Sequence, residues 1–155
     1  MYQLHLRVVE AKDLDNFDKI DKSDPYCILK ANGKEQRTKT ISNNLNPKWN
    51  QEFHFDLQSP TEGELYIKMK DKDGGLRGKD DDMATLQIQL SSCPVGQIID
   101  EWYDMKPCQK NKKGGKIHLV LNVLPEGTEA FTTMAPPQAG NPPPPANQPP
   151  PTPPP

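Results

Sequence analysis

Short runs in which apolar and polar residues alternate recur along the first 125 residues of this chain. In the first of them, residues 2–10, the apolar Leu4, Leu6 and Val8 alternate with Gln3, His5 and Arg7. A period of two residues is the pattern of a β-strand with one buried face, because successive side chains point to opposite sides. His5 falls on the outward-facing positions of this run, so we expect it to be a surface histidine. The run therefore predicts a strand.

Further segments with strand character are separated by turn-forming residues. They cover residues 26–29, 35–41, 52–57, 65–70, 83–90, 101–105 and 115–123. No stretch has a convincing helical period, although a helix in the connection 92–100 stays open. Short strands with frequent turn signals are typical of two packed sheets. The predicted fold is all-β, an eight-stranded antiparallel β-sandwich.

The composition changes after Pro125. Residues 136–155 hold 12 of the 18 prolines and contain neither a charged nor an aromatic residue. Such a segment buries too little apolar surface to fold, and it favours disorder or polyproline II. We expect one folded domain over residues 1–125, and a linker with a disordered proline-rich tail over residues 126–155.

The three cysteines show no CxxC spacing, which indicates neither a disulfide framework nor a zinc site. The chain begins Met-Tyr-Gln-Leu-His and contains no apolar segment long enough for a signal peptide or a membrane span. A cytoplasmic location is the expectation from these observations.

Aspartates gather in two short connections between predicted strands. Five lie between Asp71 and Asp82 together with three glycines, and three more stand at positions 18, 21 and 24. The net charge of the chain is −2, so these eight carboxylates stand against +6 on the rest. Like charges in short turns repel unless a cation is present, and Ca²⁺ takes about six to eight oxygen ligands in a flexible geometry. A calcium site is predicted, with a solvated acidic turn as the alternative.

Four spaced motifs resemble the C2 domain family over residues 1 to about 124. Residues 23–26, Ser-Asp-Pro-Tyr, are similar to the signature after the family's first calcium loop, and residues 46–50 resemble its NPxWN segment. Residues 71–73 resemble the DxD pair of its third loop, and residues 102–105 its WxxL strand. The first strand matches the one that leads into the family's first calcium loop. The resemblance therefore implies the circularly permuted, type II topology, with an extra strand at the end.

The resemblance also implies a set of calcium ligands. The carboxylates would come from Asp18, Asp24, Asp71, Asp73 and Asp81, and the backbone carbonyls from Phe17 and Lys72. Asp81 is chosen because residues 81–84 match the family's D-x-x-G ending, with alanine in place of glycine. The interval from Asp73 to Asp81 is two residues longer than is usual in the family, so Asp80 and Asp82 stay open. A calcium-independent C2 domain with merely polar loops is the alternative.

Binding to anionic phospholipids follows from the same resemblance, with phosphatidylserine first and phosphoinositides as further candidates. At the loops we expect Ile20, Leu76 and Arg77 to contact lipid, the first two as apolar residues at loop apices. A basic strand with Lys34, Arg37 and Lys39 forms a second candidate site, in which the latter two share a face. Folding of Ile20 back onto the sandwich and a merely solvated basic strand are the alternatives.

The tail has the PxxP spacing of polyproline II ligands, which suits an SH3 domain or a profilin-like reader. An inert solubilising tail is the alternative. An enzyme is not expected, because the sequence suggests no Ser/His/Asp or Cys/His set. A nucleic-acid partner is not expected either. The predicted function is that of an adaptor recruited by calcium to the plasma membrane or to phagosomal or vesicle surfaces. Its tail would recruit a signalling or cytoskeletal partner; a calcium-independent protein-interaction scaffold is the competing hypothesis.

Overall fold

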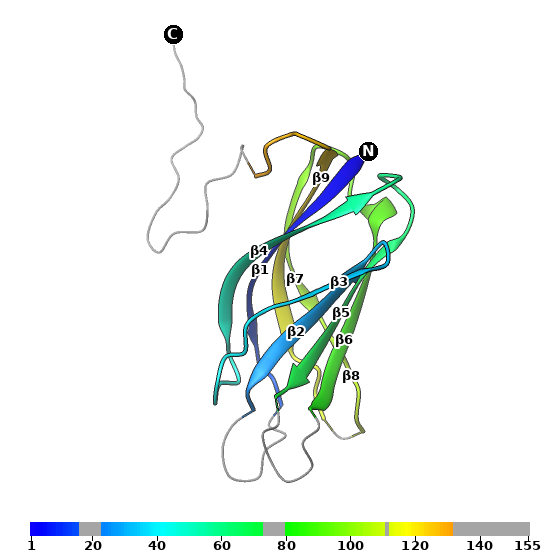
Figure 1. Ribbon diagram of the computed structural model, residues 1–155. Helices are drawn as coiled ribbons and strands as arrows, with labels where there is room; N and C mark the ends of the chain where they lie inside the picture. Colours follow the sequence, from blue (N-terminus) through cyan, green and yellow to red (C-terminus); the bar gives the residue numbers. More distant parts are fainter. Residues whose placement is uncertain (16–22, 73–79, 111, 132–155) are drawn as a thin grey trace.

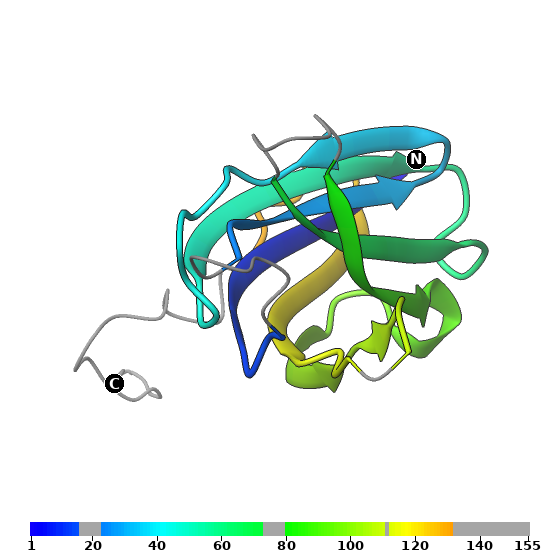
Figure 2. The ribbon, with the colours of Figure 1, turned by 90° about the horizontal axis from the view of Figure 1, so that it is seen from below.

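The computed structural model describes residues 1–15, 23–72, 80–110 and 112–131. Its strands are β1 (Tyr2–Lys12), β2 (Pro25–Ala31), β3 (Lys34–Arg37), β4 (Lys48–Leu57), β5 (Glu64–Asp71), β6 (Asp81–Gln89), β7 (Ile98–Asp104), β8 (Lys106–Pro107) and β9 (Lys116–Pro125). They form one sheet of order β4-β1-β9-β7 and a second of order β3-β2-β5-β6-β8. Figures 1 and 2 show from two directions that the sheets lie face to face. The predicted disordered tail lies outside the described residues.

The core fills the space between the two sheets, and it consists of the apolar residues of the alternating runs. Leu4, Leu6 and Val8 of β1 are fully buried, as are Leu65, Ile67 and Met69 of β5. The polar residues between them point outward, so each strand has one apolar and one polar face. The predicted antiparallel β-sandwich is confirmed. The two-residue strand β8 adds to the eight predicted strands.

Two local predictions differ from the structure. The basic strand ends at Arg37 instead of Ile41, because the side chain of Thr38 turns inward and accepts a hydrogen bond from the Cys27 amide at 2.9 Å. The chain still follows β2, since the amide of Ile41 donates to the carbonyl of Pro25 at 3.0 Å. The only helix among the described residues is a 3₁₀ turn at Leu90–Ser92, so the connection that follows it is not helical.

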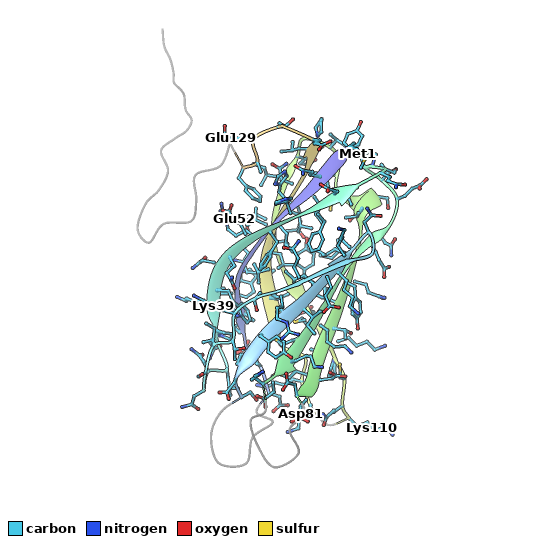
Figure 3. The ribbon with its side chains drawn as sticks, in the orientation of Figure 1. Met1, Lys39, Glu52, Asp81, Lys110 and Glu129 are labelled. Carbon is cyan, nitrogen blue, oxygen red and sulfur yellow. The ribbon has the colours of Figure 1, made fainter. Side chains whose placement is uncertain are left out.

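The strand order brings the two acidic connections to the same end of the sandwich. Pro25, the first residue of β2, lies opposite Asp71, the last residue of β5. Asp71 in turn lies opposite Asp81, the first residue of β6. β1 leads into the first acidic connection, and β9, the last strand, pairs with β1 over its whole length. This is the type II order that the sequence predicted, and Figure 3 shows Asp81 and Met1 at opposite ends of the molecule.

A short segment after β9, residues 126–131, covers part of the outer face of the β4-β1-β9-β7 sheet. Phe131 is buried there against Val9 and Val120. Its backbone amide donates to Oδ1 of the buried Asn122 at 3.1 Å. We call residues 126–131 the C-terminal strap. The sequence assigned this segment to a linker, and its aromatic anchor was not foreseen.

Below the strap lie two residues on the outward-facing positions of β1, Arg7 and His5, of which His5 was predicted to be a surface residue. The guanidinium of Arg7 lies 4.8 Å from the centre of the Phe131 ring and donates to Glu52 at 2.6 and 3.0 Å. His5 meets the edge of Phe131, and its Nε2 atom is buried without a hydrogen bond. Burial and the neighbouring His54 lower the pKa of His5. His5 takes the outward position that the sequence predicted, but its ring is half-buried against Phe131 and is not a plain surface histidine.

Candidate functional site

Hydrogen bonds tie the stems of the two acidic connections together. Asp71 is fully buried, and its Oδ1 accepts the backbone amide of Asp24 at 2.8 Å. The backbone amide of Lys72 donates to the carbonyl of Asp24 at 2.9 Å. The Oδ1 atom of Asp24 accepts the amide of Asn43 at 2.5 Å. Two predicted ligands from distant parts of the chain, Asp24 and Asp71, are thus held in one frame.

The three consecutive aspartates at the start of β6 point in different directions. Asp82 forms ion pairs with Lys68 and Lys70, each at 3.3 Å, on the outer face of the sheet. Asp80 accepts a hydrogen bond from the Tyr26 hydroxyl. Asp81 is the direct cross-strand neighbour of Asp71, and such neighbours point to the same side of a sheet. Of the three carboxylates, that of Asp81 shares the side on which Asp71 lies.

The described residues contain part of the predicted ligand set. Asp24, Asp71, Lys72 and Asp81 are described, whereas Phe17, Asp18 and Asp73 lie outside the described residues. Within the described part of the chain, no three Asp, Glu, His or Cys side chains come close enough to hold a metal ion. The carboxylates present are hard oxygen donors, and this donor chemistry fits Ca²⁺. The predicted lipid contacts Ile20, Leu76 and Arg77 also lie outside the described residues.

Basic side chains collect on the outer face of the β3-β2-β5-β6-β8 sheet. Ile28 of β2 lies opposite both Arg37 and Lys68, and Thr85, the other neighbour of Lys68, lies opposite Lys106. Lys70 is two residues further along β5 and shares the face with Lys68. We call this surface the basic face; it is formed by Arg37, Lys68, Lys70 and Lys106. The sequence had indicated only Arg37 among these, although the alternation in β5 already turned both of its lysines outward.

The other two predicted basic residues lie outside the basic face. Lys39 follows the end of β3; its amide donates to Oε1 of Gln51 at 2.7 Å, and its carbonyl accepts from Nε1 of Trp49 at 2.8 Å. Figure 3 shows Lys39 at the flank of the sandwich, beside β4. Lys34 is exposed at the β2–β3 turn, and its position in β3 alternates with that of Arg37. The three residues therefore do not form one surface.

Tyr26 connects the basic face to the second acidic connection. Its ring lies below the guanidinium of Arg37, 5.1 Å from the ring centre, and its hydroxyl donates to Asp80. Burial disfavours the phenolate, and the hydroxyl donates a hydrogen bond to the Asp80 carboxylate, so the pKa of Tyr26 rises to about 12. Its hydroxyl therefore stays a donor throughout the neutral range.

Comparison with known proteins identifies the family. The sequence model described as "C2 domain" matches residues 2–105, which is more than half of the chain. This chain belongs to the C2 domain family. A curated relative, Synaptotagmin-4 of Arabidopsis thaliana, is 34% identical over 134 residues, which is 82% of this chain and 23% of the relative. The C2 domain chain thus spans about a quarter of that protein's length.

Solved structures agree with the family. A single C2 domain of plant Extended Synaptotagmin 1 superposes with a TM-score of 0.71 at 23% identity, covering 79% of this chain and 94% of that one, which shows the shared fold. A calcium-bound pair of C2 domains from Extended-Synaptotagmin 2 gives a TM-score of 0.67 at 30% identity, over 78% of this chain and 45% of that one. In the described part of this C2 domain, no helix is long and apolar enough to cross a membrane.

Proposed function

We propose that this C2 domain binds Ca²⁺ at the end where the two acidic connections meet, and that calcium brings it to anionic phospholipid membranes. The observation that carries the proposal is the buried Asp71, whose carboxylate is hydrogen-bonded to the backbone of Asp24 and faces the same side as Asp81. Burying a carboxylate beside other carboxylates is costly unless a cation or hydrogen bonds compensate. A bound cation would supply that compensation.

The proposed ligands are those that the C2 resemblance implied: the carboxylates of Asp18, Asp24, Asp71, Asp73 and Asp81, and the backbone of Phe17 and Lys72. Two observations support Asp81 as the last carboxylate. Asp80 is hydrogen-bonded to Tyr26, and Asp82 is paired with Lys68 and Lys70. Both contacts hold these two side chains at the outer face of the sheet, away from the side of Asp71.

Membrane binding would then arise from a change of charge. Calcium ions held by the carboxylates neutralise the negative end of the domain and offer open coordination positions to headgroup phosphates. Ile20, Leu76 and Arg77 remain the proposed lipid contacts of the loops. The basic face adds Arg37 and the lysines of β5 as candidates for phosphatidylserine and phosphoinositide headgroups. Lys34 and Lys39 remain proposed lipid contacts outside this face.

The tail would give the membrane-bound domain a second partner. Its proline-rich sequence suits an SH3 domain or a profilin-like reader, and such grooves bind polyproline II with little loss of entropy. Recruitment from the cytoplasm to the plasma membrane or to phagosomal or vesicle surfaces on a rise in calcium is part of the same proposal. The domain would act as an adaptor, without a reaction of its own.

The test is co-sedimentation with phosphatidylserine liposomes, in calcium and in chelator, for the wild type and for Asp71→Asn. We expect calcium-dependent pelleting that the substitution abolishes. Asp104→Asn is the control, because it removes the same charge from a mostly exposed position at the β7 edge. Equal pelleting in chelator, or none in either condition, would contradict the proposal and favour the calcium-independent scaffold.

A further inference from the structure

We propose that Asp82 and Asp80 are specificity-determining residues that act as internal counter-anions on the basic face. They lie on the side from which a phosphate headgroup would approach Arg37, Lys68 and Lys70. Their carboxylates weaken the binding of anionic membranes to this face when calcium is absent. The inference rests on the proposed membrane function, and it assigns a role to the two aspartates that the calcium site leaves unused.

The position of Asp82 follows from an irregularity in the pairing of β5 and β6. Met69 lies opposite Ala84, but its neighbour Lys70 lies opposite Asp82, so Met83 is an extra residue in β6. Such a bulge changes which side chains share a face. With regular pairing, Lys70 would lie opposite the apolar Met83. The bulge buries Met83 and puts a carboxylate beside the lysines instead.

One carboxylate serves both lysines of β5. The Oδ2 atom of Asp82 lies 3.3 Å from Nζ of Lys68, and its Oδ1 atom lies 3.3 Å from Nζ of Lys70. The lysine side chains are 29% and 23% exposed, and that of Asp82 is 44% exposed. All three are therefore accessible to a membrane headgroup, and ion pairs this exposed are weak enough to be displaced.

Asp80 is connected to Arg37 indirectly, through Tyr26. The hydroxyl of Tyr26 donates to Asp80, and the guanidinium of Arg37 lies over the ring of the same tyrosine. Asp82 is thus paired directly with two cations of the basic face, whereas Asp80 is joined to a third, Arg37, only through the ring of Tyr26. A carboxylate attached to the protein competes at a high effective concentration with any anion from solution.

The size of the effect can be estimated from the charge. A basic residue near an anionic membrane strengthens binding about fivefold, and removal of one negative charge acts in the same direction. Asp82→Asn should therefore raise the affinity for anionic vesicles in chelator about fivefold. Asp80→Asn should raise it less, because Tyr26 separates Asp80 from Arg37. Asp82→Asn should hardly change the stability of the domain, since the ion pairs of Asp82 are exposed.

The experiment measures binding to vesicles of phosphatidylcholine with phosphatidylserine and phosphatidylinositol bisphosphate, in chelator, for the wild type and Asp82→Asn. The matched control is Asp104→Asn, which removes a carboxylate paired with a lysine, Lys116, at the edge of the other sheet. In a third protein, Asp82→Asn is combined with Lys68→Gln and Lys70→Gln. We expect a gain for Asp82→Asn, none for the control, and loss of the gain in the combined variant.

Three results would overturn the inference: no gain for Asp82→Asn, an equal gain for Asp104→Asn, or a gain that survives removal of the two lysines. Thermal unfolding of each variant shows whether it is folded. Asp80→Asn is a second test, for which a smaller increase in vesicle affinity is expected. Calcium is absent throughout. If the wild type failed to bind membranes in calcium, the proposed function would be contradicted. The effect of Asp82→Asn in chelator would still test the role of Asp82 on its own.

Discussion

The outer face of each sheet carries an arginine, which is buried on one sheet and exposed on the other. Arg7 is 5% exposed, bound to Glu52 and covered by Phe131 of the C-terminal strap. Arg37 is exposed, and its guanidinium lies on the ring of Tyr26. One arginine is used for the stability of the domain, and the other is available to a ligand.

The contrast shows what keeps a surface free for binding in this domain. Strap residues cover the middle of the β4-β1-β9-β7 sheet, so its polar face is partly interior. On the basic face, Arg37 and Lys106 are exposed, and the side chains of Lys68 and Lys70 are still 29% and 23% exposed. A charged residue therefore indicates a binding surface only if its side chain is exposed. A buried ion pair acts in folding, whereas an exposed one is accessible to a ligand.

The largest expected effect concerns the covered face. Phe131→Ala should lower the free energy of unfolding by roughly 2 kcal/mol, because the ring loses its apolar contacts with Val9 and Val120. Urea unfolding measures it. Val95→Ala, at a position that is 44% exposed, is the control and should change little. Equal unfolding midpoints for wild type and Phe131→Ala would mean that the strap does not stabilise the sheet.

Replacing each arginine separately by glutamine tests whether the covered and the open face have different roles. Arg7→Gln should reduce the stability by about 1–2 kcal/mol, through loss of a charged hydrogen bond to Glu52, and leave vesicle binding unchanged. Arg37→Gln should weaken vesicle binding about fivefold and leave the stability within about 0.5 kcal/mol. Urea unfolding and vesicle sedimentation on both variants give the answer. The same response from both would remove the distinction between the faces.

A smaller effect is expected at high pH. The folded-state pKa of Tyr26, about 12, lies above its ordinary value of 10.0, so its contribution to stability is complete below pH 10 and is lost as the pH rises toward 12. Tyr26→Phe should therefore flatten the decline of the unfolding free energy in this window. Tyr103, whose pKa is also about 12, gives a matched variant, Tyr103→Phe, that leaves Asp80 untouched.

The two tyrosine variants should differ in stability at neutral pH, because the hydroxyl of Tyr26 is hydrogen-bonded to Asp80. Tyr26→Phe removes the hydrogen bond to Asp80, and it should therefore also cost about 1 kcal/mol at neutral pH, which Tyr103→Phe should not. If both tyrosine variants behave alike at pH 7, the bond to Asp80 does not hold the second acidic connection in place.

Most of the fold could be predicted from the sequence, because the period of two residues shows directly which side chains meet in the core. Leu4 and Ile67 are clear cases. The end of β3 could not be predicted in the same way, because in the sequence Thr38 resembles any polar strand residue. Only the structure shows that its hydroxyl accepts a hydrogen bond from the Cys27 amide. Phe131 gave no signal, because a single aromatic residue between polar residues and prolines has no periodicity.

The candidate site was predictable as far as single loops allow. Asp24 and Asp71 were recognised from the residues around them, and the pairing of β2 with β5 does bring their stems together. The basic face needed knowledge of which strands are neighbours, since Arg37 and Lys68 are distant in sequence and meet only across β2. Which of the neighbours Asp81 and Asp82 faces the side of Asp71 depends on the bulge at Met83, and no local sequence pattern predicts that bulge.

The central claim is that the acidic end of this C2 domain is a calcium site built on Asp71, and thermal unfolding with increasing calcium tests it most directly. A ligand that binds only the folded state raises the unfolding temperature, and the rise grows with the ratio of the ligand concentration to its dissociation constant. We predict a calcium-dependent rise for the wild type, and none for Asp71→Asn, which should be at least as stable as the wild type in chelator. An unfolding temperature of the wild type that calcium does not change would contradict the account.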